Sequence, residues 1–207
     1  MSTRPATPQD SWNAMRDGNK RFVAGTPAHP RQDIDHREDL SAGQYPFAAL
    51  FGCADSRLSA EIIFDVGLGD LFVVRNAGQV IGNTVLGSLE YAVEVLNVPL
   101  ILVLGHDSCG AIKATNDAFE GHAPASGQYI QDLVNHIMPT VKLAHAAGEP
   151  SIDDITKLHI KDTVDDMLRD SRVISEGVKA GKLAVVGANY SLDNGEVEAL
   201  FTLGEIK

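Results

Sequence analysis

The chain contains four short apolar stretches, which predict the strands of one sheet. They lie at 47–52, 71–75, 100–105 and 183–188 and are rich in aliphatic and β-branched residues. None of them alternates apolar with polar residues, which is typical of strands that are covered on both faces, as in a parallel sheet. A fifth stretch at 196–203 alternates enough to predict an added edge strand.

Helical patterns separate these strands and predict an α/β fold with right-handed crossovers. The clearest lies at 83–97, with five apolar residues predicted on one face: Leu86, Leu89, Ala92, Val93 and Leu96. Further helices are expected at 58–67 and 108–119, and two or three within 128–182. Pro139 falls in this last region and should kink or end one of them.

The amino-terminal part differs in pattern from the rest of the chain. Residues 8–24 carry apolar side chains at spacings that fit one or two helical turns, and a stretch rich in proline and charge follows them. We therefore divide the chain into a helical arm with an extended segment, residues 1–45, and an α/β domain, residues 46–207. The whole is expected to form a single domain.

Charge and hydropathy exclude several classes of function. The 207 residues carry a formal net charge of −11, and a surface of that sign repels phosphate backbones, so nucleic-acid binding is not expected. The longest apolar stretches have the length of strands, which is too short to cross a bilayer. The amino terminus lacks an apolar signal region, so we expect a cytoplasmic protein. The acidic stretch at 151–170 is most simply a solvated helix face.

The only two cysteines of the chain both follow predicted strands. Cys53 stands after the first strand in Cys-Ala-Asp-Ser-Arg, and Cys109 stands with His106 after the third in His-Asp-Ser-Cys. Parallel strands bring their carboxyl ends to one edge of a sheet, where ligands bind. Two thiolates and an imidazole are ligands that Zn²⁺ prefers, and three protein ligands with one open position are typical of a catalytic site.

Each of these residues also has a simpler interpretation. A cysteine after a strand is often only a small core residue, and Cys53 and Cys109 could instead form a redox pair. The pair Asp55 and Arg57 could be a salt bridge at the start of a helix. Alternatively, Arg57 holds Asp55 away from the metal with two parallel hydrogen bonds, or releases it to become the fourth ligand.

The other six histidines have no matched partners and are expected on the surface or on helix faces: His29, His36, His122, His136, His145 and His159.

The two motifs together resemble those of the β-class carbonic anhydrases. The family patterns C-x-D-S-R and H-x-x-C-G stand here at 53–57 and 106–110, and 73–78, 87–106 and 187–197 resemble family segments in the same order. The resemblance implies reversible hydration of CO₂ to bicarbonate and a proton by a zinc-bound hydroxide. Zinc would be held by Cys53, His106 and Cys109, with Asp55 and Arg57 as the catalytic pair.

The resemblance also implies a substrate pocket and self-association. The residues that would line the pocket are Gln44, Phe72, Ala77, Tyr91 and Gly110. In this family the pocket is completed across a dimer interface and the amino-terminal helix packs on the partner, so we expect a homodimer or homotetramer. A bicarbonate-inhibited subgroup carries tryptophan where this chain has Leu50, so Leu50 together with Gln44 favours the plant-like arrangement.

Two other functions on the same fold stay open at this point. A zinc hydrolase of this architecture could act on another small linear molecule such as carbon disulfide. A site that Asp55 closes permanently would instead make the chain a non-catalytic zinc scaffold.

Overall fold

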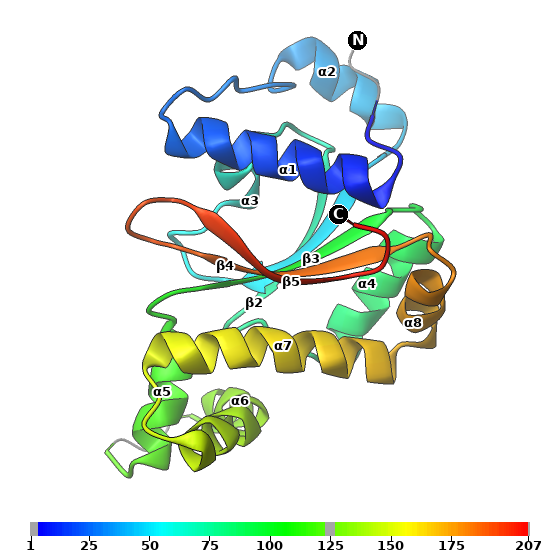
Figure 1. Ribbon diagram of the computed structural model, residues 1–207. Coiled ribbons are helices and arrows are strands. Elements are labelled where there is room, and N and C mark those ends of the chain that lie inside the picture. The colour runs from blue at the N-terminus through cyan, green and yellow to red at the C-terminus, as the bar shows by residue number, and fades with distance from the viewer. Residues whose placement is uncertain (1–3, 123–126, 207) are drawn as a thin grey trace.

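The computed structural model describes residues 4–122 and 127–206 and contains a five-stranded sheet in the order β2-β1-β3-β4-β5 (Figure 1). The strands are β1 (Ala48–Cys53), β2 (Leu71–Asn76), β3 (Leu100–His106), β4 (Ala184–Tyr190) and β5 (Val197–Leu203). The first four are parallel, and β5 is antiparallel to β4. The sequence-based prediction of a mostly parallel sheet with an added carboxyl-terminal edge strand is confirmed.

Helices cover both faces of this sheet (Figure 1). The bounds of the eight helices described are α1 (Pro8–Val23), α2 (Ile34–Asp39), α3 (Ala60–Ile63), α4 (Asn83–Glu94), α5 (Gly110–Phe119), α6 (Gln128–Ala147), α7 (Ile152–Asp170) and α8 (Arg172–Lys179). In Figure 1, α1 and α3 lie on one face, and α4, α7 and α8 on the other, with α5 and α6 beyond α7. No helix among the residues described is both long and apolar enough to cross a membrane.

Two apolar cores follow from the alternation of side chains along the buried strands. Leu50 and Leu102 point toward α1 and α3, whereas Phe51 and Val103 point toward α4, α7 and α8. Every residue of β1 and β3 is buried, as the absence of alternation predicts. Strand β2 lies at the edge of the sheet and is only half-buried, so the expectation of two covered faces does not hold there.

Most predicted helices are present, with some corrections. The region 58–67 contains only the four-residue α3, because the chain turns sharply at Asp65, which has a φ of 43°. Pro139 lies inside α6 and does not end it. In α4, Leu89 and Ala92 are buried as predicted, and the other predicted apolar residues are half-buried against the same core.

The amino-terminal arm is more ordered than the sequence indicates. Helix α1 has 16 residues instead of one or two turns, and the following segment contains α2 and a short 3-10 helix, Leu40–Ala42. The carboxylate of Asp65 accepts hydrogen bonds from the backbone N–H groups of Ala28 and His29, at 2.8 and 2.9 Å. These contacts hold the segment against the core.

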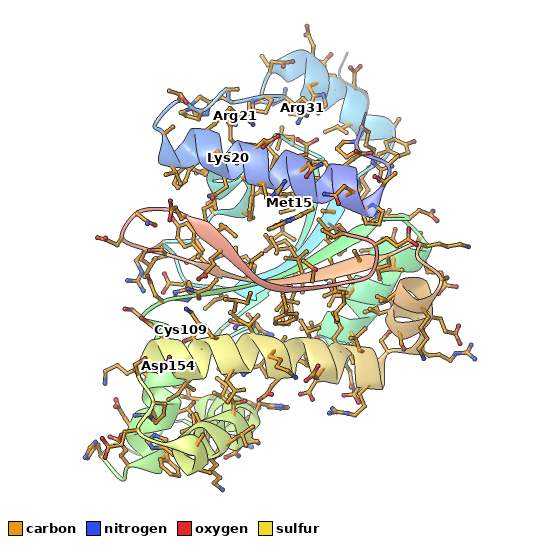
Figure 2. All side chains as sticks on the ribbon, in the orientation of Figure 1. Met15, Lys20, Arg21, Arg31, Cys109 and Asp154 are labelled. Carbon is orange, nitrogen blue, oxygen red and sulfur yellow. The ribbon has the colours of Figure 1, made fainter. Side chains whose placement is uncertain are left out.

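Helix α1 packs on the sheet of its own chain. Trp12 and Met15 are 3% and 0% exposed, and Figure 2 shows Met15 between α1 and the sheet. Asn19 donates to the carbonyls of Ile63 and Gly195, and its Oδ1 accepts from the N–H of Val197. The apolar residues of α1 are thus buried within the subunit, while its packing on a partner stays a prediction.

Replacing Asn19 by alanine should lower the free energy of unfolding markedly. The change leaves buried backbone groups without partners, at about 1–3 kcal/mol each. Urea unfolding of the variant, compared with Asn13→Ala on the same helix, measures the effect. The Asn13 side chain accepts hydrogen bonds from the side chains of Gln9 and Arg16 on its own helix and holds no backbone group of the core in the described structure, so the control should change stability by less than about 0.5 kcal/mol. Equal losses in the two variants would contradict this account of α1.

Candidate metal centre

The two cysteines and His106 meet at the carboxyl edge of the sheet. Cys53 is the last residue of β1, His106 the last residue of the neighbouring β3, and Cys109 precedes α5. Their ligand atoms all lie within 4.8 Å of one another, and all three residues are buried. Figure 2 shows Cys109 between the sheet and the beginning of α7. The strand order therefore brings together the three side chains that the sequence predicted as metal ligands.

The orientation of the His106 ring leaves one nitrogen for a metal. Its Nδ1 lies 2.8 Å from the carbonyl of Asp107, so Nδ1 carries the proton and donates it there. Its Nε2 is buried and has no hydrogen-bond partner among the residues described. A buried, unpaired acceptor costs free energy, and coordination of a metal would satisfy it. A backbone carbonyl on the other nitrogen is the arrangement typical of metal-binding histidines.

The two thiols share one proton when no metal is bound. The hydrogen bond from Cys109 lowers the pKa of Cys53 to about 4 in spite of burial, with His106 and the N–H of Gly78 acting in the same direction. The same hydrogen bond, together with burial, raises the pKa of Cys109. Burial lowers the pKa of His106, but the neighbouring Cys53 thiolate raises it overall. A divalent metal would displace this proton and compensate both thiolates.

Backbone N–H groups face both sulfurs. The N–H of Gly78 donates to Cys53 Sγ at 3.5 Å. The N–H groups of Ala111 and Ile112, in the first turn of α5, lower the pKa of Cys109 against the effects of Cys53 and burial. A helix amino terminus stabilises a thiolate through its free N–H groups and its dipole. The surroundings therefore favour a thiolate at Cys53, and the first turn of α5 would help to stabilise a second one at Cys109 if a metal were bound.

Asp55 and Arg57 form a pair beside this cluster. Arg57 donates through Nε to Asp55 Oδ1 at 2.9 Å and through Nη2 to Oδ2 at 2.8 Å, and its backbone N–H also donates to Oδ1. These hydrogen bonds hold the pKa of Asp55 well below its usual range, although burial opposes them. Asp55 Oδ2 nevertheless lies only 3.9 Å from His106 Nε2. The carboxylate is thus close to the cluster but held by Arg57.

Arg75 fixes the loop that carries this pair. It donates to the carbonyl of Cys53 at 2.8 Å and to the carbonyl of Asp55 at 2.6 Å. The sequence assigned Arg75 no role of its own. The signal that could have found it is its position at the end of β2, next to the end of β1 in the register.

Comparison with known proteins agrees with this geometry. Residues 48–197 match the family model described as carbonic anhydrase. Carbonic anhydrase 2 of Mycobacterium tuberculosis is 52% identical over 200 residues, which cover 96% of each chain. The carbonic anhydrase of Mycolicibacterium smegmatis is 50% identical over 202 residues, covering 97% of each.

The chain belongs to the carbonic anhydrase family. The solved structure of the β-carbonic anhydrase CcaA superposes with a TM-score of 0.72 at 27% identity, covering 92% of this chain and 95% of that one. The predicted resemblance to the β class and the prediction of a carbonic anhydrase are thereby confirmed. Metal binding by the Cys-His-Cys cluster is consistent with this family, in contrast to a redox pair.

The residues predicted to line a carbonic anhydrase pocket fall into two groups. Ala77 precedes Gly78, the residue that contacts Cys53, and Gly110 follows Cys109 at the beginning of α5, so both belong to the carboxyl edge. Gln44 precedes β1 and therefore lies at the opposite, amino edge of the sheet. The structure brings only Ala77 and Gly110 toward the metal centre of the same chain.

Phe72 and Tyr91 belong with Gln44 rather than with the metal centre. Phe72 pairs with Ala49 in the sheet register. Ala49 comes four residues before Cys53, so Phe72 lies about 13 Å from the level of Cys53 along the strand direction. Its ring centroid lies 6.1 Å from that of Tyr91, which is 44% exposed. These aromatic side chains can line a carbonic anhydrase pocket only if that pocket belongs to another subunit.

One of the histidines predicted on the surface or on a helix face lies on a buried helix face. His159 of α7 is 5% exposed, and its Nε2 lies 2.8 Å from the carbonyl of Gly78. The signal that could have indicated its burial is its spacing of four residues from Ile155 and from Thr163, which belong to the same buried face of α7. Its position depends on how α7 packs against β3 and the turn after β2.

Proposed function

We propose that this carbonic anhydrase reversibly hydrates CO₂ on a zinc ion held by Cys53, His106 and Cys109. The observation that carries the proposal is the buried cluster of two thiols and an imidazole with an unpaired Nε2. The donor set suits zinc, because thiolate and imidazole are its preferred ligands. When bound at such a site, zinc acts as a Lewis acid that lowers the pKa of coordinated water toward neutrality.

Asp55 orients the reacting water in this proposal. The oxygen Oδ2 faces the cluster at 3.9 Å from His106 Nε2, within reach of a water bound beside that nitrogen. Since Arg57 keeps the pKa of Asp55 low, the carboxylate stays ionised and can only accept a hydrogen bond. The reacting water must then donate to Oδ2, which turns a lone pair of its oxygen toward CO₂.

Arg57 decides whether Asp55 serves as an acceptor or as a fourth ligand. Its guanidinium group donates one hydrogen bond to each oxygen of the Asp55 carboxylate in the structure. A bidentate pair of this kind fixes the carboxylate in orientation as well as position. The arrangement supports an open, catalytically competent site rather than one that Asp55 closes permanently.

Self-association completes the pocket in the proposed enzyme. Gln44, Phe72 and Tyr91 lie at the amino edge of the sheet, beside the half-buried edge strand β2. In a symmetric dimer this edge can face the carboxyl edge of the partner, so that each subunit supplies these three residues to the other. The exposed ring of Tyr91 would then be covered by the interface.

Stopped-flow CO₂ hydration with zinc analysis tests the central proposal. The purified protein should contain about one zinc per chain and show fast turnover, and His106→Gln should lose both because it removes one of the three ligands. The matched control is His136→Gln, which changes an exposed histidine of α6 and should leave zinc content and rate unchanged. Full zinc without CO₂ turnover would overturn the proposed substrate, and turnover of carbon disulfide would then identify the alternative.

Releasing Asp55 should inactivate the enzyme without removing zinc. In Arg57→Gln the carboxylate loses its fork and becomes free to coordinate, so we expect a rate lower by roughly 10- to 100-fold. In the cobalt-substituted form, the visible spectrum of this variant should no longer respond to thiocyanate, whereas that of the wild type should. Arg169→Gln is the control, because Arg169 makes a similar fork to Asp170 on the distant part of α7. An active Arg57→Gln enzyme would refute the assigned role.

Mixed dimers test whether the pocket is shared between subunits. Gln44→Ala and Cys53→Ser should each impair the homodimer, but a heterodimer of the two variants should regain activity above the mean of its parents. Its intact metal centre would receive Gln44 from the other subunit. Pairing Cys53→Ser with Asp55→Asn should give no recovery, because Asp55 acts in its own chain. Two differently tagged, co-expressed chains allow the heterodimers to be isolated, and no recovery with Gln44→Ala would contradict the shared pocket.

A further inference from the structure

The turn after β2 lies between the sulfur of Cys53 and helix α7. Gly78 uses both of its backbone polar groups there: its N–H donates to Cys53 Sγ at 3.5 Å, and its carbonyl accepts from His159 Nε2 at 2.8 Å. The two groups flank a single Cα atom. Holding the carbonyl on one side therefore limits the rotation of the N–H on the other.

The rest of the turn leaves Gly78 little freedom to adjust. Gly78 has a φ of +78°, and a Cβ at this position would lie 2.9 Å from Ala111 Cβ and from Ile137 Cδ1. The side chain of Asn76 closes the turn, because it donates to the carbonyl of Val80 at 2.7 Å and accepts from its N–H at 2.8 Å. The turn is thus fixed on both sides, so a small displacement of the Gly78 backbone changes the distance between its N–H and the sulfur of Cys53.

His159 is an unusual residue for the place it occupies. It is 5% exposed, and its Nδ1 has no hydrogen-bond partner in the described part of the chain. Burial lowers its pKa, so the ring is neutral and carries its single proton on Nε2, which faces the Gly78 carbonyl. An apolar side chain would fill this space without the unpaired Nδ1, but it would leave the Gly78 carbonyl without this donor. What the imidazole provides in addition is one hydrogen-bond donor aimed at Gly78.

We propose that His159 is a positioning residue for the metal centre. Its hydrogen bond to the Gly78 carbonyl holds the Gly78 N–H on the sulfur of Cys53, and so sets how much charge this sulfur donates to a bound metal. The proposal rests on the proposed function only in requiring Cys53 to be a metal ligand. His159 touches neither the substrate nor the ligand itself and acts through one backbone residue.

The consequence of losing this hydrogen bond has a definite sign. An N–H group that donates to a thiolate withdraws charge from the sulfur. Without it the sulfur donates more strongly, which makes the metal a weaker Lewis acid. The pH–rate profile for CO₂ hydration should then move to higher pH. Partners of this kind typically contribute about 10- to 100-fold to metal affinity or activity.

Cobalt substitution of the full-length enzyme provides the test. In His159→Leu, the sulfur-to-cobalt charge-transfer band should shift to longer wavelength, because the sulfur donates more strongly to the metal. His159→Gln keeps a nitrogen donor at a similar reach in a side chain of similar volume, so it should restore the wild-type band position. His145→Leu is the control for the loss of a hydrogen-bonded histidine, because His145 contacts Asn116 instead of the turn. It should leave the band unchanged.

Each outcome decides the proposal. An unshifted band in His159→Leu, or equal shifts in the leucine and glutamine variants, overturns it. If His159→Leu does not fold, nitrogen NMR of the wild-type protein decides through the tautomer: a proton on Nε2 supports the proposal, and a proton on Nδ1 overturns it. A wild-type enzyme without any charge-transfer band would overturn the thiolate ligation itself. A normal band that does not respond to the variants overturns only the role of His159.

Discussion

The parallel pairing of β1 with β3 is the constraint on which the metal centre depends. Each strand ends at a proposed ligand, Cys53 or His106, and the register places both ends at the same edge. The side chains arrive buried and close together because the strands are covered on both faces. An unpaired Nε2 and a shared thiol proton in such surroundings are costly unless a metal takes their place. The fold therefore builds and desolvates the site at the same time.

Much of this arrangement could be predicted because its determinants are local. Apolar stretches without alternation identify buried parallel strands, and parallel strands imply a common edge for the residues that follow them. The contacts that complete the site are not local. Arg75 and His159 reach it from β2 and α7, and only the packing of these elements shows that they do. The spacing of His159 from Ile155 and Thr163 indicates the buried face of α7, but it does not reveal that the partner of His159 is Gly78.

The amino-terminal arm shows the same limit in a different way. Its proline and charge pattern resembles a loose connection, yet Asp65 holds its backbone through two N–H groups that have no signature in the sequence. Helix α1 was expected to need a partner for its apolar residues, but Trp12 and Met15 are buried on the sheet of their own chain. Apolar side chains that stay exposed include Ile34 and Tyr45 in the arm as well as Tyr91 in α4, beside the half-buried β2. The proposed dimer can bury both of these surfaces.

The two edges of the sheet thus have different roles in the proposed enzyme. The carboxyl edge holds the charged groups, whose positions must be exact because the pKa of Asp55 depends on its fork with Arg57. The amino edge offers an amide and two aromatic rings, which tolerate small displacements because apolar contacts are not directional. A subunit interface is less rigid than a strand register. It is consistent with this difference that the metal ligands come from one chain, while the proposed walls of the CO₂ pocket come from the other.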